Sequence, residues 1–357
     1  MRDAARPLGW GIVGYGWVAR DFSGPAMRAA GHKPAAIFDP SPTARAAARA
    51  DGLAVHDTLA SLLADPAVDA VYVATPNHRH RVPVEQALAS GLPVLCEKPM
   101  AASLAEAQAM ARAARASGTL YGTAFDQRHH PAHDAMRLAV SGGRLGTVTA
   151  LRIVYACWLG ADWSATGGSP NWRADPAAAG GGALMDLAPH GLDLVEFLLG
   201  EPVCAVTGAV QNRVHGYAVD DGAMILGRTA SGVLVSLHVA YNHPETLPRR
   251  RLEVLGTDGL LVANDTMGQE PGGRVVLHDA RTGEACPLEI PDADTSPFTR
   301  QIAAFGRAVH GEGRDRFDAV RDLHTMELLH QAYEAAARLQ PATAFARRPP
   351  VEAVPCR

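Results

Sequence analysis

Cysteines are few in this sequence, and long apolar runs are absent from it. Five cysteines stand among 357 residues, an odd number without CxxC spacing, so neither a disulfide framework nor a zinc site is predicted. No apolar stretch approaches the ~20 residues of a membrane-spanning helix, and no secretory segment precedes the first predicted strand. We therefore expect a cytoplasmic protein with reduced thiols and no membrane contact.

The sequence also lacks an excess or a long run of charge of one sign. The chain carries 33 basic and 37 acidic residues without a long run of either, which gives no electrostatic footprint for nucleic acid. Small molecules are therefore the expected partners. The length exceeds the ~250–300 residues at which a single hydrophobic core stops growing, so two domains are expected.

The first third of the chain alternates strand and helix patterns, which predicts a parallel, doubly wound sheet. We expect this domain to span residues 1–123. Its predicted strands lie at 9–13, 34–38, 69–74, 93–96 and 119–122, and its helices at 17–30, 42–50, 57–64, 79–90 and 103–117.

The second part, residues 124–345, has a different pattern. A strand at 148–158, a loop and a helix precede closely spaced strands, which favour an antiparallel meander. Helices are expected at 297–310 and 318–339, followed by a loosely held tail at 346–357. The predicted strands of this part lie at 203–211, 223–228, 233–241, 250–256, 259–263 and 274–278.

The segment Trp10–Ala19 joins an apolar strand to a helix through glycines. Gly14 allows a tight turn, Gly16 lets the backbone approach a pyrophosphate, and Ala19 keeps the helix near the strand. Such turns also occur for geometric reasons alone. We predict a dinucleotide site here, whose turn also includes Tyr15, Trp17 and Val18.

Asp39 ends the next strand, 39 − 16 = 23 residues after Gly16. An acid near this offset binds the ribose hydroxyls and repels a 2′-phosphate, so NAD is predicted in preference to NADP. If the Arg45 side chain reached a 2′-phosphate, NADP would be preferred instead. The alternative for Asp39 is a turn and helix cap.

Two motifs follow buried strands of the first domain. Thr75, Pro76, Asn77 and His80 stand at a carboxyl edge where ligands of doubly wound sheets lie, although the Thr-Pro pair could merely cap a helix. Glu97 and Lys98 follow the next such strand. An ammonium there can bind a substrate hydroxyl or a developing oxyanion, and the alternative is a surface ion pair.

A third motif, Gly180–Asp193, begins with three glycines and continues as an amphipathic helix. Asp186 and His190 are four residues apart and share a helical face. A histidine can accept a proton near neutral pH, and a neighbouring carboxylate can orient it. A structural role is the alternative, and no third ligand supports zinc. Pro189 removes a helical hydrogen bond, so the helix is expected to begin late or to bend.

Together these motifs resemble the Gfo/Idh/MocA family, which includes glucose-fructose oxidoreductase and inositol dehydrogenase. The resemblance covers residues from about 8 to 340 in family order. It implies an N-terminal Rossmann domain and a C-terminal α/β domain with a large, mainly antiparallel open sheet. It further implies a homodimer or homotetramer and NAD(P)-dependent hydride transfer at a carbinol of a polyhydroxylated substrate.

The resemblance also implies roles for individual residues. Lys98 would bind the reacting oxygen and contact the cofactor, His190 would be the acid and base, and Asp186 would assist and bind substrate. The loop at 159–179 leads into this helix, and its Asn171, Trp172 and Arg173 are predicted to contact substrate.

Some assignments stay open. Arg128 lies in a matching segment and either binds substrate or forms an interdomain salt bridge. Tyr241 and His243 are weaker candidates. Motif position alone favours His190 over other nearby histidines, namely His78, His80, His129 and His130.

Three functions are compatible with these residues. The first is a sugar or cyclitol dehydrogenase or reductase with a dissociable cofactor. The second is an epimerase, eliminating glycosidase or substrate-to-substrate oxidoreductase that retains its nicotinamide, which predicts turnover without added cofactor. The third is a sensor that binds without turnover.

Overall fold

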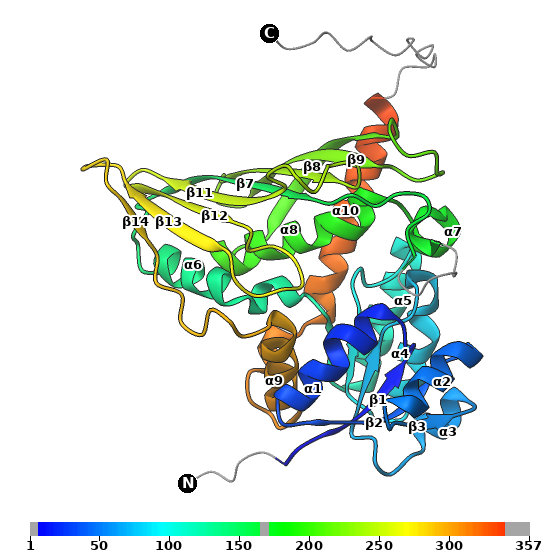
Figure 1. Cartoon of the computed structure of the whole chain (residues 1–357). Helices are drawn as coiled ribbons and strands as arrows, with labels where there is room; N and C mark the ends of the chain where they lie inside the picture. The colour runs from blue at the N-terminus through cyan, green and yellow to red at the C-terminus, as the bar shows by residue number, and fades with distance from the viewer. Residues whose placement is uncertain (1–5, 165–170, 340–357) are drawn as a thin grey trace.

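The computed structural model describes residues 6–164 and 171–339, so the predicted tail at 346–357 lies outside it. The described chain forms two sheets with helices between and around them (Figure 1). Within these residues no helix is both long and apolar enough to cross a membrane.

The N-terminal sheet is parallel, with strand order β3-β2-β1-β4-β5-β6, as the alternating pattern predicts. A short edge strand, β3, was not predicted, because three residues give too little periodicity to recognise. The strands are β1 (Gly9–Val13), β2 (Lys33–Phe38), β3 (Ala54–His56), β4 (Ala70–Val73), β5 (Val94–Cys96) and β6 (Tyr121–Thr123).

Helices flank this sheet close to their predicted positions. The first predicted helix is divided into a π-helical turn at Val18–Ser23 and α1 (Gly24–Ala29). The others are α2 (Pro42–Ala50), α3 (Leu59–Leu63), α4 (Arg81–Ala89) and α5 (Leu104–Ser117).

The second sheet has eight strands in the order β14-β13-β12-β11-β7-β10-β9-β8. It is mainly antiparallel, but the simple meander is wrong, because β7 lies between β10 and β11 and pairs with β10 in parallel. The strands are β7 (Val148–Ala156), β8 (Val203–Gln211), β9 (Gly222–Thr229), β10 (Leu234–Ala240), β11 (Arg250–Gly256), β12 (Gly259–Asn264), β13 (Arg274–Asp279) and β14 (Ala285–Pro287).

Helices of the second part cover the sheet face that looks toward the N-terminal domain (Figure 1). They are α6 (Pro131–Ser141), α8 (Ala183–Leu199) and α10 (Ala319–Leu339). The short α7 (Pro176–Ala179) packs instead on the turn at Asn77–Arg79. Helix α9 (Pro297–Val309) packs on α1, and its Phe305 contacts Trp10 of β1. Helix α8 lies between the two sheets (Figure 1).

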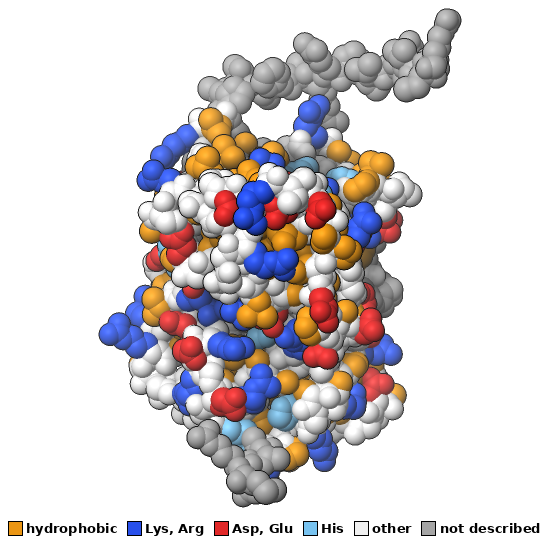
Figure 2. Space-filling model, turned by 90° about the vertical axis from the view of Figure 1, so that its left-hand side faces the viewer, with side chains coloured by type: hydrophobic (Ala, Val, Ile, Leu, Met, Phe, Trp, Pro, Cys, Tyr) orange, Lys and Arg blue, Asp and Glu red, His pale blue; other side chains and the backbone are white. Residues whose placement is uncertain are grey.

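The outer face of the large sheet carries no helix among the described residues (Figure 1). Exposed apolar side chains on it include Met224, Leu226 and Leu234, which are 55%, 61% and 62% exposed. A different face of the molecule shows basic and acidic side chains interspersed (Figure 2), without a field of one sign.

Candidate active site

The glycine turn after β1 has the geometry that a dinucleotide requires. Gly14 has φ +89°, and a Cβ there would lie 2.8 Å from the Ala74 carbonyl oxygen. A Cβ at Gly16 would meet nothing within 4 Å, so a ligand can approach that backbone closely. Ala19 is fully buried, which lets the following helical turn approach the strand. Gly14 therefore forms the predicted tight turn, and the approach of a pyrophosphate to Gly16 stays a prediction.

Asp39 lies beside this turn at the end of β2. Its carboxylate accepts the backbone N–H of Tyr15 at 2.8 Å and that of Ser41 at 2.7 Å. Arg45 donates to the carbonyl oxygens of Asp39 and Pro40 at 3.2 and 3.3 Å. Asp39 thus orders the turn in this structure, and Arg45 is held on the backbone of its own loop.

The carboxyl edge of β4 presents one unpaired group. Thr75 Oγ1 is buried and has no hydrogen-bond partner within the described part of the chain, which suits a hydroxyl that contacts a cofactor. His80 is fully buried, with its ring nitrogens 2.9 Å from the Thr75 carbonyl and 3.1 Å from the Pro99 carbonyl. The Asn77 amide donates to Ala179 O at 2.8 Å. The structure therefore gives His80 and Asn77 positioning contacts, and their cofactor contacts stay predictions.

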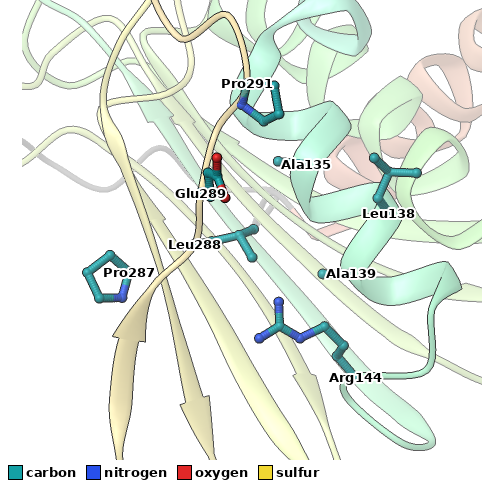
Figure 3. Close-up of a pocket in the computed structure, with 8 residues that line it drawn as sticks. All are labelled: Ala135, Leu138, Ala139, Arg144, Pro287, Leu288, Glu289 and Pro291. Carbon is teal, nitrogen blue, oxygen red and sulfur yellow. The ribbon is translucent and has the colours of Figure 1, made fainter.

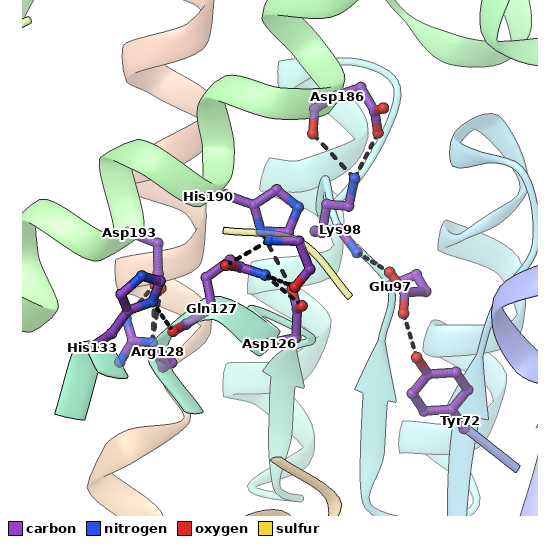
Figure 4. Close-up of polar contacts among 11 residues, drawn as sticks. Tyr72, Glu97, Lys98, Asp126, Gln127, Arg128, His133, Asp186, His190 and Asp193 are labelled. Atoms are coloured by element: carbon purple, nitrogen blue, oxygen red, sulfur yellow. Dashed lines mark hydrogen bonds and ion pairs between the residues drawn. The ribbon is translucent and has the colours of Figure 1, made fainter. Parts of the chain in front are cut away.

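Lys98 and Asp186 meet where β5 ends beside α8 (Figure 4). Lys98 Nζ donates to Asp186 Oδ1 at 2.6 Å and to its carbonyl oxygen at 3.1 Å, and Tyr241 OH donates to Oδ2 at 2.7 Å. Burial alone would raise the pKa of Asp186, but the charges of Lys98 and Arg173 and these hydrogen bonds hold it well below its usual range. Because an ammonium has three donors, one N–H of Lys98 remains for a substrate oxygen.

His190 stands one helical turn after Asp186 and is 4% exposed. Burial and the Lys98 charge hold its pKa well below the usual value, so the ring is neutral and can accept a proton. Nδ1 lies 3.4 Å from Asp126 Oδ1 (Figure 4), a loose ion-pair distance without hydrogen-bond alignment. The ring also packs edge-on against Tyr155 at 5.6 Å.

Asp126 was not predicted as a site residue. Burial and the neighbouring Glu97 charge raise its pKa to about 7, and Gln127 donates to its Oδ2 at 2.7 Å. In the segment at residues 125–131, only Arg128 was predicted to belong to the site. The sequence alone does not reveal that Asp126 lies beside a histidine 64 residues later (190 − 126).

Helix α8 is fixed at its first turn. Asp220 accepts the backbone N–H groups of Gly182 and Leu184, each at 2.8 Å, and Tyr333 donates to the same carboxylate. A Cβ at Gly182 would lie 1.9 Å from the Asp220 carbonyl oxygen, which explains the glycine. The helix begins at Ala183 and contains Pro189 in its interior, so the predicted late start is wrong.

The Arg128 side chain is 11% exposed and forms a salt bridge with Asp193, in which Nε donates to Oδ2 at 2.9 Å (Figure 4). This salt bridge lies within the second part of the chain, residues 124–345, so it is not the interdomain bridge that was expected. A substrate contact by Arg128 stays a prediction. The competing histidines all have structural contacts. The ring nitrogens of His78 and His80 lie against backbone carbonyls, His129 stacks on a phenylalanine, and His130 accepts a backbone N–H.

The predicted substrate loop brings aromatic rings over the site, although its residues 165–170 lie outside the described chain. The Arg173 guanidinium lies over Trp172 at 4.5 Å and over Trp163 at 5.1 Å, and Trp163 meets Trp17 of the glycine turn at 5.9 Å. Asn171 instead caps the next turn, because its Oδ1 accepts the Arg173 N–H. Trp172 and Arg173 are thus placed near Asp186, whose pKa responds to the Arg173 charge.

Glu97 completes the cofactor side of the site. It accepts a hydrogen bond from Tyr72, whose hydroxyl in turn accepts from Ser23 Oγ at 2.7 Å (Figure 4). Burial raises the Glu97 pKa. An unpaired buried hydroxyl at Thr75, an open approach at Gly16 and this buried carboxyl fit a nicotinamide dinucleotide.

A surface groove elsewhere contains none of these residues. It lies between α6 and the segment around β14 (Figure 3), and its lining includes Leu138, Arg144 and Leu288. No group of three or more potential metal ligands exists among residues 6–164 and 171–339. The convergent side chains, not the groove, therefore mark the site.

Two family models match the chain. The model described as an oxidoreductase family with an NAD-binding Rossmann fold covers residues 8–125, and the GFO/IDH/MocA C-terminal domain covers residues 133–262.

Known relatives agree with these matches. The chain is 34% identical to 1,5-anhydro-D-fructose reductase of Ensifer adhaerens, over 85% of this chain and 89% of that protein. It is 30% identical to D-xylose 1-dehydrogenase (NADP(+)) 2 of Haloferax volcanii, over 92% and 97%. A solved levoglucosan dehydrogenase in complex with NADH and levoglucosan superposes with a TM-score of 0.79 at 25% identity, covering 93% and 98%. The chain therefore belongs to the GFO/IDH/MocA family of NAD(P)-dependent oxidoreductases and is an enzyme of its dehydrogenase and reductase class.

Proposed function

We propose that this enzyme transfers a hydride between nicotinamide and a carbinol or ketone carbon of a sugar, cyclitol or sugar-derived compound. The observation that carries the proposal is the meeting of Lys98, Asp186 and His190 beside the glycine turn. The three named relatives, a reductase and two dehydrogenases of sugars, support this substrate class.

Each residue of the site has a separate role in the proposed hydride transfer. The bound dinucleotide supplies the hydride acceptor or donor. Lys98 uses its remaining N–H to bind the reacting oxygen and stabilise its negative charge. His190 removes the hydroxyl proton through Nε2, and the charge of the Asp126 carboxylate, 3.4 Å from Nδ1, favours a proton on Nδ1. Asp186 holds the Lys98 ammonium in place, and ketone reduction uses the same contacts in reverse.

NAD is proposed as the preferred cofactor. The Asp39 carboxylate stands next to the Tyr15 backbone of the dinucleotide turn. A 2′-phosphate placed there would be repelled by this charge, and Arg45 is engaged with backbone carbonyls. Glu97, Thr75, Asn77 and the other residues predicted at the carboxyl edges would line the remainder of the cofactor site.

We also propose that the enzyme forms a homo-oligomer in the cytoplasm. The outer face of the large sheet presents apolar side chains without a covering helix, which suits contact with a second copy of the chain. Light scattering coupled to size-exclusion chromatography tests this directly, because a monomer at micromolar concentration would contradict it.

The activity is tested by initial rates of NADH or NADPH formation across a panel of sugars and cyclitols, with a reaction that receives no added cofactor. A cofactor-dependent rate, faster with NAD, is expected. Turnover without added cofactor would instead identify an enzyme that retains its nicotinamide. Tight binding of NAD without any turnover would identify a sensor.

A further inference from the structure

Arg250 lies on the large sheet, on the side of β11 that the helices cover. Arg250 begins β11, and residues 252 and 254, which share its side of the strand, are fully buried against the helices. Since alternate residues of a strand share one face, the Arg250 side chain points to the same covered side. The next residue, Arg251, points outward and pairs with Glu253.

The position of Arg250 relative to the catalytic residues follows from two contacts. Its cross-strand partner is Tyr155, whose ring packs on that of His190. A Cβ on Gly268 would lie 2.4 Å from Arg250 Nη1, so the guanidinium lies directly against Gly268. Gly268 exchanges two hydrogen bonds with the Gln127 amide, and Gln127 also binds Asp126. Arg250 is therefore separated from His190 by one residue, Tyr155, on the first path, and by three residues on the second.

Arg250 has no ion-pair partner within the described residues. Its Nε is buried without a hydrogen-bond partner. Its charge acts on Glu245, but that carboxylate pairs with Arg249, and Asp186 pairs with Lys98. Burial and the charge of Asp126 raise the pKa of the Tyr155 phenol, and the Arg250 charge opposes that rise, so the charge is felt beside His190.

The Arg250 side chain is partly buried, and its buried Nε lacks a partner, which is costly because a buried polar group is stabilised only when it is hydrogen-bonded. The planar donors of a guanidinium match two oxygens of one carboxylate or phosphate. Arg173, a second arginine near the site, lies against aromatic rings, and its charge acts on Asp186. An anionic oxygen beside Arg250 would therefore supply the missing hydrogen-bond partner.

We propose that Arg250 binds an anionic group of the substrate, so that the enzyme acts preferentially on acidic sugars. The group is a carboxylate or phosphate on a carbon distant from the one that exchanges hydride. This inference rests on the proposed function and narrows its substrate class.

The test uses the enzyme loaded with NADH and three pairs of ligands, in which glucose, galactose and mannose are each compared with their uronates. D-glucose 6-phosphate is a further arm that separates a phosphate from a carboxylate. Quenching of fluorescence from Trp163 and Trp172, which flank Arg173, reports binding without turnover. At least one acidic ligand is expected to bind about tenfold or more tightly than its neutral parent.

Variants assign that preference to one side chain. Arg250→Gln should abolish the difference between acidic and neutral ligands, Arg250→Lys should retain part of it, and the outward-facing control Arg251→Gln should retain all of it. Thermal melting of each variant confirms that it is folded. The inference is overturned if acidic and neutral ligands bind alike, if none binds, or if the preference survives in Arg250→Gln. If neutral sugars are oxidised and acidic ligands show no tighter binding, the inference about Arg250 is wrong while the proposed dehydrogenase activity is retained.

Discussion

Removal of the Tyr241 hydroxyl tests how the catalytic lysine is positioned. Tyr241 is 1% exposed and donates at 2.7 Å to Asp186 Oδ2, while Lys98 binds Oδ1 of the same carboxylate at 2.6 Å. A hydrogen bond to a charged group contributes about 1.5–3 kcal/mol. Since a factor of ten in rate corresponds to about 1.4 kcal/mol, Tyr241→Phe should lower kcat/KM by roughly 10- to 150-fold if that energy serves catalysis.

The assay is the initial rate of NADH formation at saturating NAD with varied substrate. Tyr121→Phe is the matched control, because that buried hydroxyl forms a hydrogen bond with Thr123 and, in the described part of the chain, none with Asp186. It should leave kcat/KM within a few-fold of the parent. NADH binding by fluorescence should be unchanged in both variants. A Tyr241→Phe enzyme as active as the parent would refute the idea that Asp186 must be held from both sides.

Two further changes follow from the same geometry. Alcohol oxidation is favoured when Asp126 is ionised, because its charge beside Nδ1 stabilises the protonated His190 ring, and the pKa of Asp126 is raised to about 7. The oxidation rate should therefore increase as pH rises through about 7. The pH profile of Asp126→Asn should lack this increase. An unchanged increase in that variant would show that another group controls it. Gly182→Ala places a Cβ 1.9 Å from the Asp220 carbonyl oxygen, which should lower the free energy of unfolding by about 3 kcal/mol. Urea denaturation measures this against Gly216→Ala, whose Cβ meets nothing within 4 Å, and equal stability of the two variants would contradict the clash.

The sequence predicts well what depends on local pattern. Glycine spacing at Gly14 and Gly16 locates the dinucleotide turn, and strand alternation locates most elements to within two residues. The short strand β3 was missed because tertiary pairing creates it, not periodicity. The placement of β7 between β10 and β11 was missed for a related reason, since strand order depends on long-range contacts that spacing does not record.

Within the site, motif position predicted Lys98, Asp186 and His190 and offered Tyr241 only as a weaker candidate, and it gave no sign of Asp126. Asp126 and Tyr241 reach these residues from distant segments, and only the fold reveals that their side chains converge. Pro189 shows the opposite limitation. Local rules predicted that the helix would begin late or bend. It does not begin late, because Asp220 anchors the first turn from another element, and the helix continues through the proline.

The central claim is that Lys98 and His190 carry out the chemistry while the Rossmann domain binds the dinucleotide independently. Its most direct test is single-turnover hydride transfer by Lys98→Ala and His190→Ala, measured together with NADH affinity. We expect each variant to bind NADH within a few-fold of the parent and to transfer hydride about 10²- to 10⁴-fold more slowly. Hydride transfer at the parental rate in either variant would contradict the account by removing that residue from the mechanism.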